Sequence, residues 1–580
     1  MDTMLPLKTL NERLAKLRHE AEEREARQIA LKANVEYLDL ATVPVNVEAL
    51  RLMSEKSARE AGMAPFAMKR EEVAVAVMNP LSAETAAALK ALRDRGFSIK
   101  VVVGSRYGLE HLWSFYAFVA AEKAPITSRV NIEKDRIITL ERELGSLGTA
   151  ASRLEAVDIE HFAVADFLEL VIAGALGNRA SDIHFEPEEK AVKLRYRVDG
   201  LLHDVLVTFP HDPYRAVVSR IKLLSNLKIN VLDRPQDGRF TIGLGMKDIE
   251  IRVAIAPSEF GEIIVMRVLD PDAINLSLGD LGLRDDDLEI VSVELKRPNG
   301  MVLNTGPTGS GKTTTLYAFL KSKVSPEIKI ITIEDPVEYH VPGLEQTEVD
   351  EEAGYTFANG LRSMMRQDPD IILVGEVRDK ETAEIAIQAA LTGHLVFSTV
   401  HANEAAGAVP RFLDLGVRPT SLGPALNLVI GQRLVRTLCK QCKKPKQITA
   451  ELKAEIESFL KTLPARVKRE TYANPTLFEP KGCDVCGKSG YKGRIAIFEL
   501  LLNDPDFEIV KEGKAESLSS EKELEALILK QAGESEIFEY ARKTGMVTMQ
   551  EDGVLKVLQG KTTFDEVEEV TGKIRAFKAH

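Results

Sequence analysis

The sequence predicts a multidomain α/β protein whose last domain is built on a parallel β-sheet. From Leu276 onward, four apolar runs alternate with helical patterns, as in a parallel sheet covered by helices on both faces; the runs are 301–303, 328–333, 371–374 and 395–399. A glycine-rich loop and a helical pattern follow the first run. The length of 580 residues allows three or four domains at roughly 150 residues each.

The glycine-rich loop has the full pattern of a phosphate-binding P-loop, Gly-x4-Gly-Lys-Thr, between a strand and a helix. Its glycines let backbone N–H groups converge on an anion, and the following helix adds the positive end of its dipole. Lys312 is expected to reach the β and γ phosphates, and Thr313 to offer its hydroxyl to Mg²⁺. The predicted nucleotide-binding residues are Gly306, Pro307, Thr308, Gly309, Ser310, Gly311, Lys312, Thr313 and Thr314.

Polar side chains follow the other three runs. Glu334 closes the second run, Glu376 follows the third and His401 follows the fourth. Active groups lie beyond the carboxyl ends of parallel strands, and an NTPase needs carboxylates there to hold the magnesium shell and to activate water. Arg362 and Arg366 are four residues apart on one helical face, where they either converge on transferring phosphate or form a solvated charge pair.

Composition restricts the partners. A net charge of −12 argues against general nucleic-acid binding, although a basic face could exist within that total. The sequence contains no apolar run of the length that a membrane span needs, and its start is charged, unlike a signal peptide. These features predict a cytoplasmic protein that reaches membranes only through partners.

The chain before the P-loop domain divides into four predicted segments. Residues 1–34 form an amphipathic helix that either docks or joins a coiled coil, 35–125 an α/β partner-docking domain, 126–156 a linker helix, and 157–273 a second α/β domain. In the first domain we expect strands at Val73–Val77 and Ile99–Val103 around a helix at Ser82–Arg95. The aromatic patch at Trp113 is expected to be core, with a partner surface as the alternative.

In the second domain we expect helices at 164–176 and 214–225 and strands at 191–198, 201–207, 248–255 and 263–269. Residues 234–239, Arg-Pro-Gln-Asp-Gly-Arg, are expected to form a turn. The ATPase domain is expected to span 274–580, with a metal subdomain at 439–486 and a helical region at 500–580.

The four cysteines fall in two Cys-x2-Cys pairs, Cys439 with Cys442 and Cys483 with Cys486. Four thiolates in two such pairs are what structural Zn²⁺ selects, so we expect one zinc ion with no open coordination position. Idle reduced thiols and a redox role are the alternatives.

Four segments of the last domain resemble the Walker A, Asp box, Walker B and His box of the ATPases of type II secretion and type IV pilus assembly. They are GPTGSGKTTT, ITIEDPVEY, LRSMMRQDPDIILVGEVRD and LTGHLVFSTVHAN. ASDIHFEP, RYRVDG, RPQDGRF and GEIIVMRVLD resemble the domain that precedes the motor in that family, and QRLVRTLC and GYKGRIAIFELL the region after it. The resemblance begins near Val35 and implies a RecA-like core preceded by a PAS-like domain and a small α/β domain.

The resemblance also implies a hexameric ring in which ATP lies between the motor domain and the domain before it. It implies that Arg252 and Arg267 contact the γ-phosphate, that Glu334 and Glu376 share water activation and magnesium binding, and that His394 and His401 sense the γ-phosphate. The implied partners are an inner-membrane platform protein and cytoplasmic docking proteins, with the ATPase peripheral at the inner face of the cytoplasmic membrane.

Retraction motors generally lack the first domain and the paired cysteines, so assembly is favoured, while the choice between pilus and secretion system stays open. A nucleic-acid or DNA-uptake motor with the same core, and an inactive regulator, are the other functional classes. The acidic total disfavours the former, and the intact motifs disfavour the latter.

Overall fold

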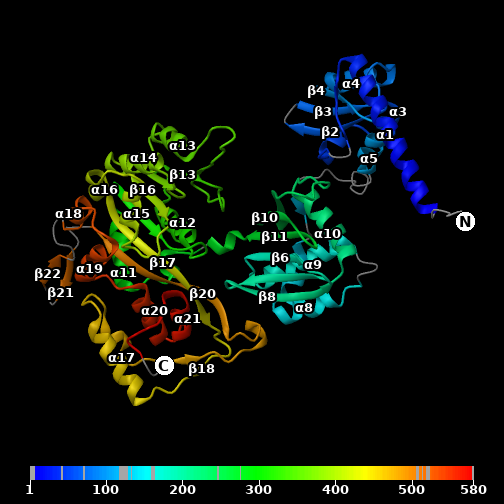
Figure 1. Ribbon diagram of the computed structural model, residues 1–580. Helices are drawn as coiled ribbons and strands as arrows, with labels where there is room; N and C mark the ends of the chain where they lie inside the picture. Colours follow the sequence, from blue (N-terminus) through cyan, green and yellow to red (C-terminus); the bar gives the residue numbers. More distant parts are fainter. Residues whose placement is uncertain are drawn as a thin grey trace, which may run out of the picture. The chain divides into compact units, whose positions relative to one another are not determined.

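The computed structural model describes residues 7–40, 43–69, 72–116, 129–131, 134–158, 163–244, 247–274, 276–503, 508–511, 514–517 and 523–577. The chain divides into two compact units. The first holds residues up to 144, 149–198 and 202–268, and the second holds 145–148, 199–201 and everything from Leu269. Figure 1 shows both with the element labels used below.

A four-stranded sheet of order β1-β4-β3-β2 forms the centre of the first domain. Helices α1 and α4 pack on one face, while α2, α3 and α5 pack on the other. Trp113 is buried there and its indole N–H donates to the Met63 carbonyl at 3.1 Å, so the aromatic patch is core as expected. The elements are α1 (Leu7–Ala33), β1 (Glu36–Tyr37), α2 (Val47–Leu50), α3 (Glu55–Glu60), β2 (Met63–Lys69), β3 (Glu72–Val77), α4 (Ala83–Asp94), β4 (Ser98–Val103) and α5 (Arg106–Ser114).

The second domain is a seven-stranded sheet of order β5-β9-β10-β11-β6-β7-β8 with α9 and α10 packed together. Phe167 of α9 stacks on Phe209 at a centroid distance of 4.8 Å. The elements are β5 (Arg129–Asn131), α7 (Lys134–Glu143), α8 (Leu147–Glu155), α9 (Val164–Gly177), β6 (Asp182–Pro187), β7 (Val192–Val198), β8 (Leu201–Phe209), α10 (His211–Leu224), β9 (Gln236–Leu244), β10 (Lys247–Ser258) and β11 (Gly261–Leu269).

Two expectations for this part of the chain were wrong. Most of the predicted turn at 234–239 is the start of β9, where Gly238 pairs with Val253 of β10. The glycine is needed for close packing, since a Cβ atom at Gly238 would lie 2.5 Å from the Ser225 carbonyl oxygen. The predicted linker helix at 126–156 contains β5, which pairs with β9, and two separate helices. The two strands, β9 and β5, form through tertiary pairing, which local sequence patterns do not report.

The sheet of the last domain has the order β14-β13-β15-β16-β12-β17-β20, parallel except for the antiparallel β17–β20 pair. This arrangement confirms the predicted α/β class. Its elements up to β17 are α11 (Asp285–Glu294), β12 (Gly300–Thr305), α12 (Lys312–Lys323), β13 (Ile330–Glu334), β14 (Glu345–Glu348), α13 (Phe357–Met365), β15 (Ile371–Val374), α14 (Lys380–Leu391), β16 (Leu395–Val400), α15 (Ala408–Asp414), α16 (Pro419–Ala425) and β17 (Leu426–Leu438).

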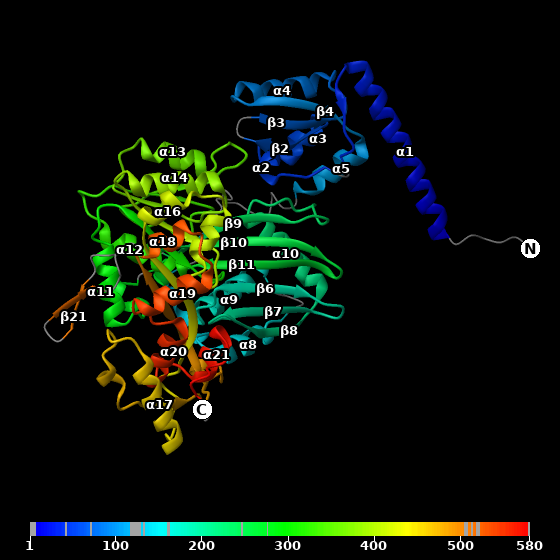
Figure 2. The ribbon, with the colours of Figure 1, turned by 60° about the vertical axis from the view of Figure 1, so that its left-hand side comes forward.

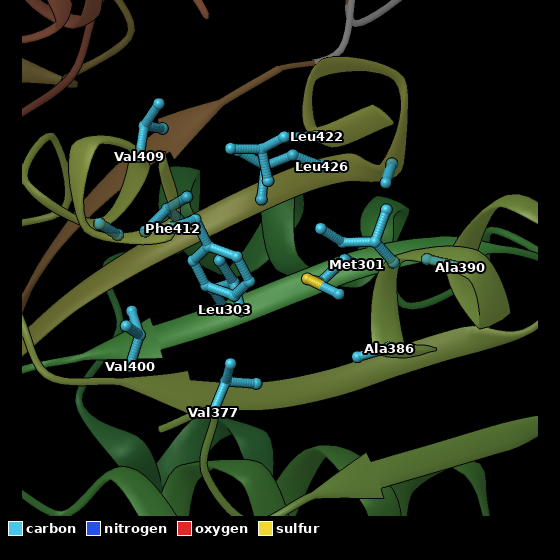
Figure 3. Close-up of a cluster of buried hydrophobic side chains, with 14 of the residues drawn as sticks. Met301, Leu303, Val377, Ala386, Ala390, Val400, Val409, Phe412, Leu422 and Leu426 are labelled. Carbon is cyan, nitrogen blue, oxygen red and sulfur yellow. The ribbon is translucent and has the colours of Figure 1, made fainter. Parts of the chain in front are cut away.

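Both faces of this sheet are covered. Helices α11 and α12 share one apolar core with the strands. Helices α13 to α16 share the other core with two C-terminal helices, α18 (Glu523–Leu529) and α19 (Glu534–Lys543). Figures 1 and 2 show α13 beside α14 on the second face. In Figure 3, Met301 and Leu303 of β12 pack with Phe412 of α15. Burial of each such side chain contributes roughly 1.5–3 kcal/mol to the free energy of folding. This packing fixes the strand ends relative to one another.

In the C-terminal region, α17, α20 and α21 pack with β17 and β20 to form a third apolar core. Its elements are β18 (Lys444–Pro445), α17 (Ala450–Thr462), β19 (Phe478–Glu479), β20 (Tyr491–Leu502), β21 (Glu508–Lys511), β22 (Lys514–Ser517), α18 (Glu523–Leu529), α19 (Glu534–Lys543), α20 (Met549–Leu558) and α21 (Phe564–Thr571). None of the helices in the described ranges has both the length and the apolar character that crossing a bilayer requires.

Candidate functional site

The P-loop joins the carboxyl end of β12 to the start of α12. Gly306, Gly309 and Gly311 have φ angles of 145°, 79° and 88°, a region that L side chains rarely adopt. The Lys312 ammonium donates to the carbonyl oxygens of Gly306 at 2.8 Å and Pro307 at 3.0 Å. Burial lowers the pKa of Lys312, and the nearby Glu376 carboxylate opposes this. The loop therefore holds a cation that burial makes costly and that a phosphate would stabilise.

Gln432 of β17 packs against the P-loop. Its role was not predicted from the sequence. A Cβ atom at Gly306 would lie 2.3 Å from the Gln432 carbonyl oxygen, and one at Gly311 would lie 2.9 Å from its amide nitrogen. The side-chain amide of Asn304 donates to Gln432 Oε1 at 2.8 Å. The available signal was a glutamine shortly after the apolar run 428–430, because a polar side chain buried at a strand position needs a partner.

Glu334, at the end of β13, is buried and fully bonded. Its Oε2 accepts from the Tyr317 hydroxyl at 2.5 Å, and its Oε1 accepts from the Thr332 hydroxyl at 2.6 Å and from the Gln346 amide at 3.3 Å. Burial raises the pKa of Glu334, although the three hydrogen bonds lower it in part. Tyr317 belongs to α12, so the P-loop helix and this carboxylate are mechanically joined.

Glu376 follows β15 and is held by an imidazole and a guanidinium group. His401 Nε2 lies 3.1 Å from Glu376 Oε2, and the Arg378 guanidinium contacts Oε1. Arg378 also lies 3.2 Å from Asp335. Val377 is buried in the core and its N–H donates to the Thr399 carbonyl at 3.0 Å, which anchors the segment. The structure thus brings together the predicted Lys312, Glu376 and His401, and adds Arg378.

Two buried hydroxyls beside the loop fit a bound phosphate group. Ser310 Oγ and Thr315 Oγ1 are both inaccessible to solvent and have no hydrogen-bond partner among the described residues. Buried hydroxyls normally have a partner, so donors left over at a P-loop suit phosphate oxygens. The predicted magnesium ligand, Thr313, lies between these two residues in the sequence at the start of α12.

His394 does not lie at this edge. It immediately precedes β16, and its carbonyl accepts from the N–H of Gly300, the first residue of β12, at 3.2 Å. The six residues of β16 span about 20 Å, so His394 is at the opposite edge from the P-loop of the same domain. Its predicted contact with the γ-phosphate is therefore wrong for that P-loop.

The predicted arginine pair is exposed and bonded locally. Arg362 contacts Glu381 at 2.5 Å and Asn359 at 3.2 Å, and Arg366 donates to the Arg362 carbonyl at 3.0 Å. These contacts match the solvated pair that sequence reasoning kept as the alternative. A role for the pair in phosphoryl transfer stays a prediction.

In the first unit, Arg252 lies on β10 and Arg267 on β11. Arg267 Nε lies 3.1 Å from Asp182 of β6, and Arg252 Nε lies 3.6 Å from Glu250. The Arg267 side chain is 54% exposed and that of Arg252 19%. Each arginine thus has an acidic partner within its own sheet.

The four cysteines converge in the second unit. All four Sγ atoms lie within 4.8 Å of one another, and three of the pairs are separated by 3.7 to 3.9 Å. Tetrahedral zinc with Zn–S bonds of 2.3 Å requires S–S distances of about 3.8 Å. The cluster therefore fits a tetrahedral thiolate site.

The Type II/IV secretion system protein family matches residues 158–569, and the MshEN domain matches residues 33–114. This chain belongs to the type II/IV secretion system protein family. The family predicted from the motifs is thereby confirmed, and this chain, like its relatives, is a P-loop ATPase of the secretion and pilus-assembly class that hydrolyses ATP.

Two curated relatives illustrate the range of the family. Type II secretion system protein E of Pseudomonas aeruginosa is 42% identical over 408 residues, which cover 70% of this chain and 74% of that protein. Type IV pilus assembly ATPase PilB of Myxococcus xanthus is 36% identical over 533 residues, 91% of this chain and 88% of that protein. The solved Yersinia pseudotuberculosis ATPase DotB shares the fold at a TM-score of 0.50 and 21% identity, covering 71% of this chain and 94% of that chain.

Proposed function

We propose that this ATPase works as a hexameric motor that drives the assembly of a type IV pilus or a type II secretion pseudopilus from the inner face of the cytoplasmic membrane. The observation that carries the proposal is the group at the carboxyl edge of the sheet: Lys312, the two carboxylates of Glu334 and Glu376, and His401 next to Glu376. These are the parts that ATP hydrolysis needs.

The two carboxylates would divide the chemistry. We assign Glu334 as the proton acceptor for the attacking water, because burial raises its pKa above the ordinary value of a carboxyl group and so makes the carboxylate a stronger base. Glu376 would orient groups on the Lys312 side of the site, with His401 and Arg378 fixing its two oxygens. Thr313 would hold Mg²⁺, which when bound offsets the charge of the phosphates.

Arg252 and Arg267 would complete the site from the domain before the motor. Both are guanidinium groups, which match phosphate oxygens in geometry and charge. Their present acidic partners, Glu250 and Asp182, would be exchanged for the γ-phosphate, so nucleotide state would change the pairing of the second domain. That exchange supplies the motion of one domain against the other.

Membrane and machine partners follow from the relatives that cover most of this chain. PilB of Myxococcus xanthus is named as a type IV pilus assembly ATPase. We propose that the N-terminal domain docks a cytoplasmic or inner-membrane component of such a machine. Nucleic acid is not proposed as a partner, because the net charge of −12 opposes it.

We also propose that Cys439, Cys442, Cys483 and Cys486 hold one structural zinc ion. The cluster lies where β17 ends and β20 begins, outside the P-loop edge, and its thiol separations match a tetrahedron. Zinc bound by four thiolates contributes folding free energy directly, so it would brace the C-terminal region.

A phosphate-release assay on the purified full-length protein tests the function. We expect turnover that is unchanged by DNA and stimulated by membranes containing the cognate machine. Stimulation by DNA with no response to the machine would instead favour the nucleic-acid motor, and no turnover in any condition would favour the regulator.

A further inference from the structure

Glu499, in the middle of β20, is a buried carboxylate with no assigned role. It is 2% exposed and pairs with Gly431 of β17 in the antiparallel ladder. A Cβ atom at Gly431 would lie 2.7 Å from Glu499 Cγ and 3.1 Å from the Ala405 nitrogen. The missing side chain at Gly431 therefore opens a passage through which Glu499 reaches across β17.

The carboxylate of Glu499 bonds two distant parts of the motor domain. Oε1 accepts from the N–H of Ala405 at 2.7 Å, and Oε2 accepts from the N–H of Met549 at 3.2 Å. Ala405 lies in residues 401–407, which connect β16 to α15 and which we call the His401 loop. Met549 is the first residue of α20. Glu499 thus joins the His401 loop to the start of a C-terminal helix.

The His401 loop is fixed at its other end by the P-loop strand. Thr305, the last residue of β12, exchanges two hydrogen bonds with Ala402: its hydroxyl donates to the Ala402 carbonyl at 2.8 Å and accepts from the Ala402 N–H at 2.9 Å. His401 itself lies against Glu376. The loop therefore has one attachment at the ATP site and one at Glu499.

We propose that Glu499 is a positioning residue for ATP hydrolysis, which sets the His401 loop, and through it Glu376, according to the position of α20. The proposal rests on the role of the Glu376 and His401 pair given above. Glu499 does not touch the reacting atoms. It acts through the loop, so its removal is expected to lower kcat while the KM for ATP stays nearly constant.

The charge of Glu499 matters for this role, since an ionised carboxylate accepts both N–H groups whereas a protonated one offers fewer acceptor sites. The pKa of Glu499 is raised to about 7: burial raises it most and Glu404 raises it further, whereas the two backbone hydrogen bonds and Arg433 lower it in part. The N-terminus of α20 also favours the ionised form. The carboxylate is therefore about half ionised near pH 7, so the link between loop and helix strengthens as the pH rises through this value and weakens as it falls.

The test compares Glu499→Gln with wild type in ATP turnover from pH 6 to 8 and in hydrogen exchange of residues 401–407. We expect roughly tenfold lower kcat at pH 8 with less than about twofold change in KM, since the glutamine amide lacks the charge that strengthens both hydrogen bonds and keeps only one acceptor oxygen. In the wild type, kcat should rise with pH around pH 7, and this rise should be smaller in Glu499→Gln. The amide hydrogen of Ala405 should exchange with solvent faster in the variant. Gly431→Ala, which keeps the carboxylate but fills its passage, should give the same two changes.

Glu566→Gln is the matched control, because Glu566 is also a buried carboxylate that bonds β17, through Arg436, but contacts no residue of the His401 loop. It should lower thermal stability without altering the pH profile or the exchange of the loop. If Glu499→Gln matches this control in both readouts, the positioning role is wrong. Faster loop exchange with wild-type turnover in both Glu499→Gln and His401→Ala would instead locate the failure in the proposed role of His401.

Discussion

The Nε2 atom of His401 lies 3.1 Å from Oε2 of Glu376, and these residues follow neighbouring strands of the motor sheet, β16 and β15. The relationship ties the His box to the Walker B carboxylate. It also gives each of the two residues a defined orientation before any phosphate is bound.

His401→Ala should therefore lower kcat by about tenfold or more with a small effect on nucleotide affinity, because the loss is one oriented charge-assisted hydrogen bond. His401→Gln, which can still donate to Glu376, should recover part of the rate. His394→Ala is the control at the opposite edge of the sheet and should keep wild-type turnover. Equal losses in the two alanine variants would contradict the placement of the site.

Arg252→Ala and Arg267→Ala should each reduce turnover by about a hundredfold while nucleotide binding by the purified protein changes little, because these groups act mainly on charge that develops during transfer. Arg195→Ala provides a control in the same sheet, since Arg195 also pairs with acidic neighbours, Glu186 and Asp204. Turnover in steady state and affinity by fluorescent-nucleotide titration separate the two effects. A wild-type rate in Arg267→Ala would remove this arginine from the site.

Replacing Cys439 and Cys442 together by serine should abolish zinc binding and lower the thermal unfolding midpoint, since the metal contributes to folding. Elemental analysis of protein purified without chelator should find one zinc per chain in the wild type. Lys440→Ser, an exposed change within the same pair, should leave both properties unchanged. Zinc far below one equivalent, with four freely titrating thiols in the folded protein, would overturn the assignment.

A buried ionic cluster links α11, the insertion between the cysteine pairs, and α20. Arg284 lies 2.9 Å from Asp552 and 2.6 Å from Asp287, and Arg466 lies 2.7 Å from Asp287. Lys556 also contacts Asp552. Arg284, Arg466, Asp552 and Lys556 line part of a cavity of about 450 Å³.

Asp552→Asn should destabilise the motor domain by about 3–5 kcal/mol at neutral pH, because two cations lose their buried partner. Burial raises the pKa of Asp552, but Lys556, Arg284 and hydrogen bonds more than offset this, so the pKa in the folded protein is below its usual value. The stability that this carboxylate contributes is thus present above the unfolded pKa and lost as pH falls through the folded pKa. Thermal unfolding should show a weaker loss below about pH 4 in Asp552→Asn than in wild type.

Glu384→Gln removes an exposed pair with Lys380 and is the control, with an expected effect below about 0.5 kcal/mol. An Asp552→Asn protein as stable as this control would show that the cluster has no stabilising role.

The P-loop, Glu334, Glu376 and His401 could be predicted from sequence because each follows an apolar strand at a fixed place in its motif. The four predicted strand runs correspond to β12, β13, β15 and β16 within about two residues at each end. The position of His394 in the sequence already indicates the opposite edge of the sheet. His394 precedes the strand that His401 follows, and the two ends of a strand lie at opposite edges.

Other features depend on tertiary contacts that no local pattern reports. Gln432 reaches the P-loop because β17 pairs with β12, and Glu499 reaches the His401 loop because Gly431 lacks a side chain. Asp237-Gly238 suggests a turn in sequence, yet β10 pairs with it as a strand. The coiled-coil alternative for the first helix depends on leucines at heptad spacing, Leu7, Leu10, Leu14 and Leu17, whose side chains are outside the described part of the chain.

The central claim, that the two strand-end carboxylates carry out hydrolysis at the P-loop, is tested most directly by ATP turnover of Glu334→Gln and Glu376→Gln beside Lys312→Ala. We predict that both glutamine variants bind nucleotide but hydrolyse it at least about a hundredfold more slowly, whereas Lys312→Ala loses turnover because the phosphate counter-charge is gone. Wild-type hydrolysis rates in both Glu334→Gln and Glu376→Gln would contradict the account.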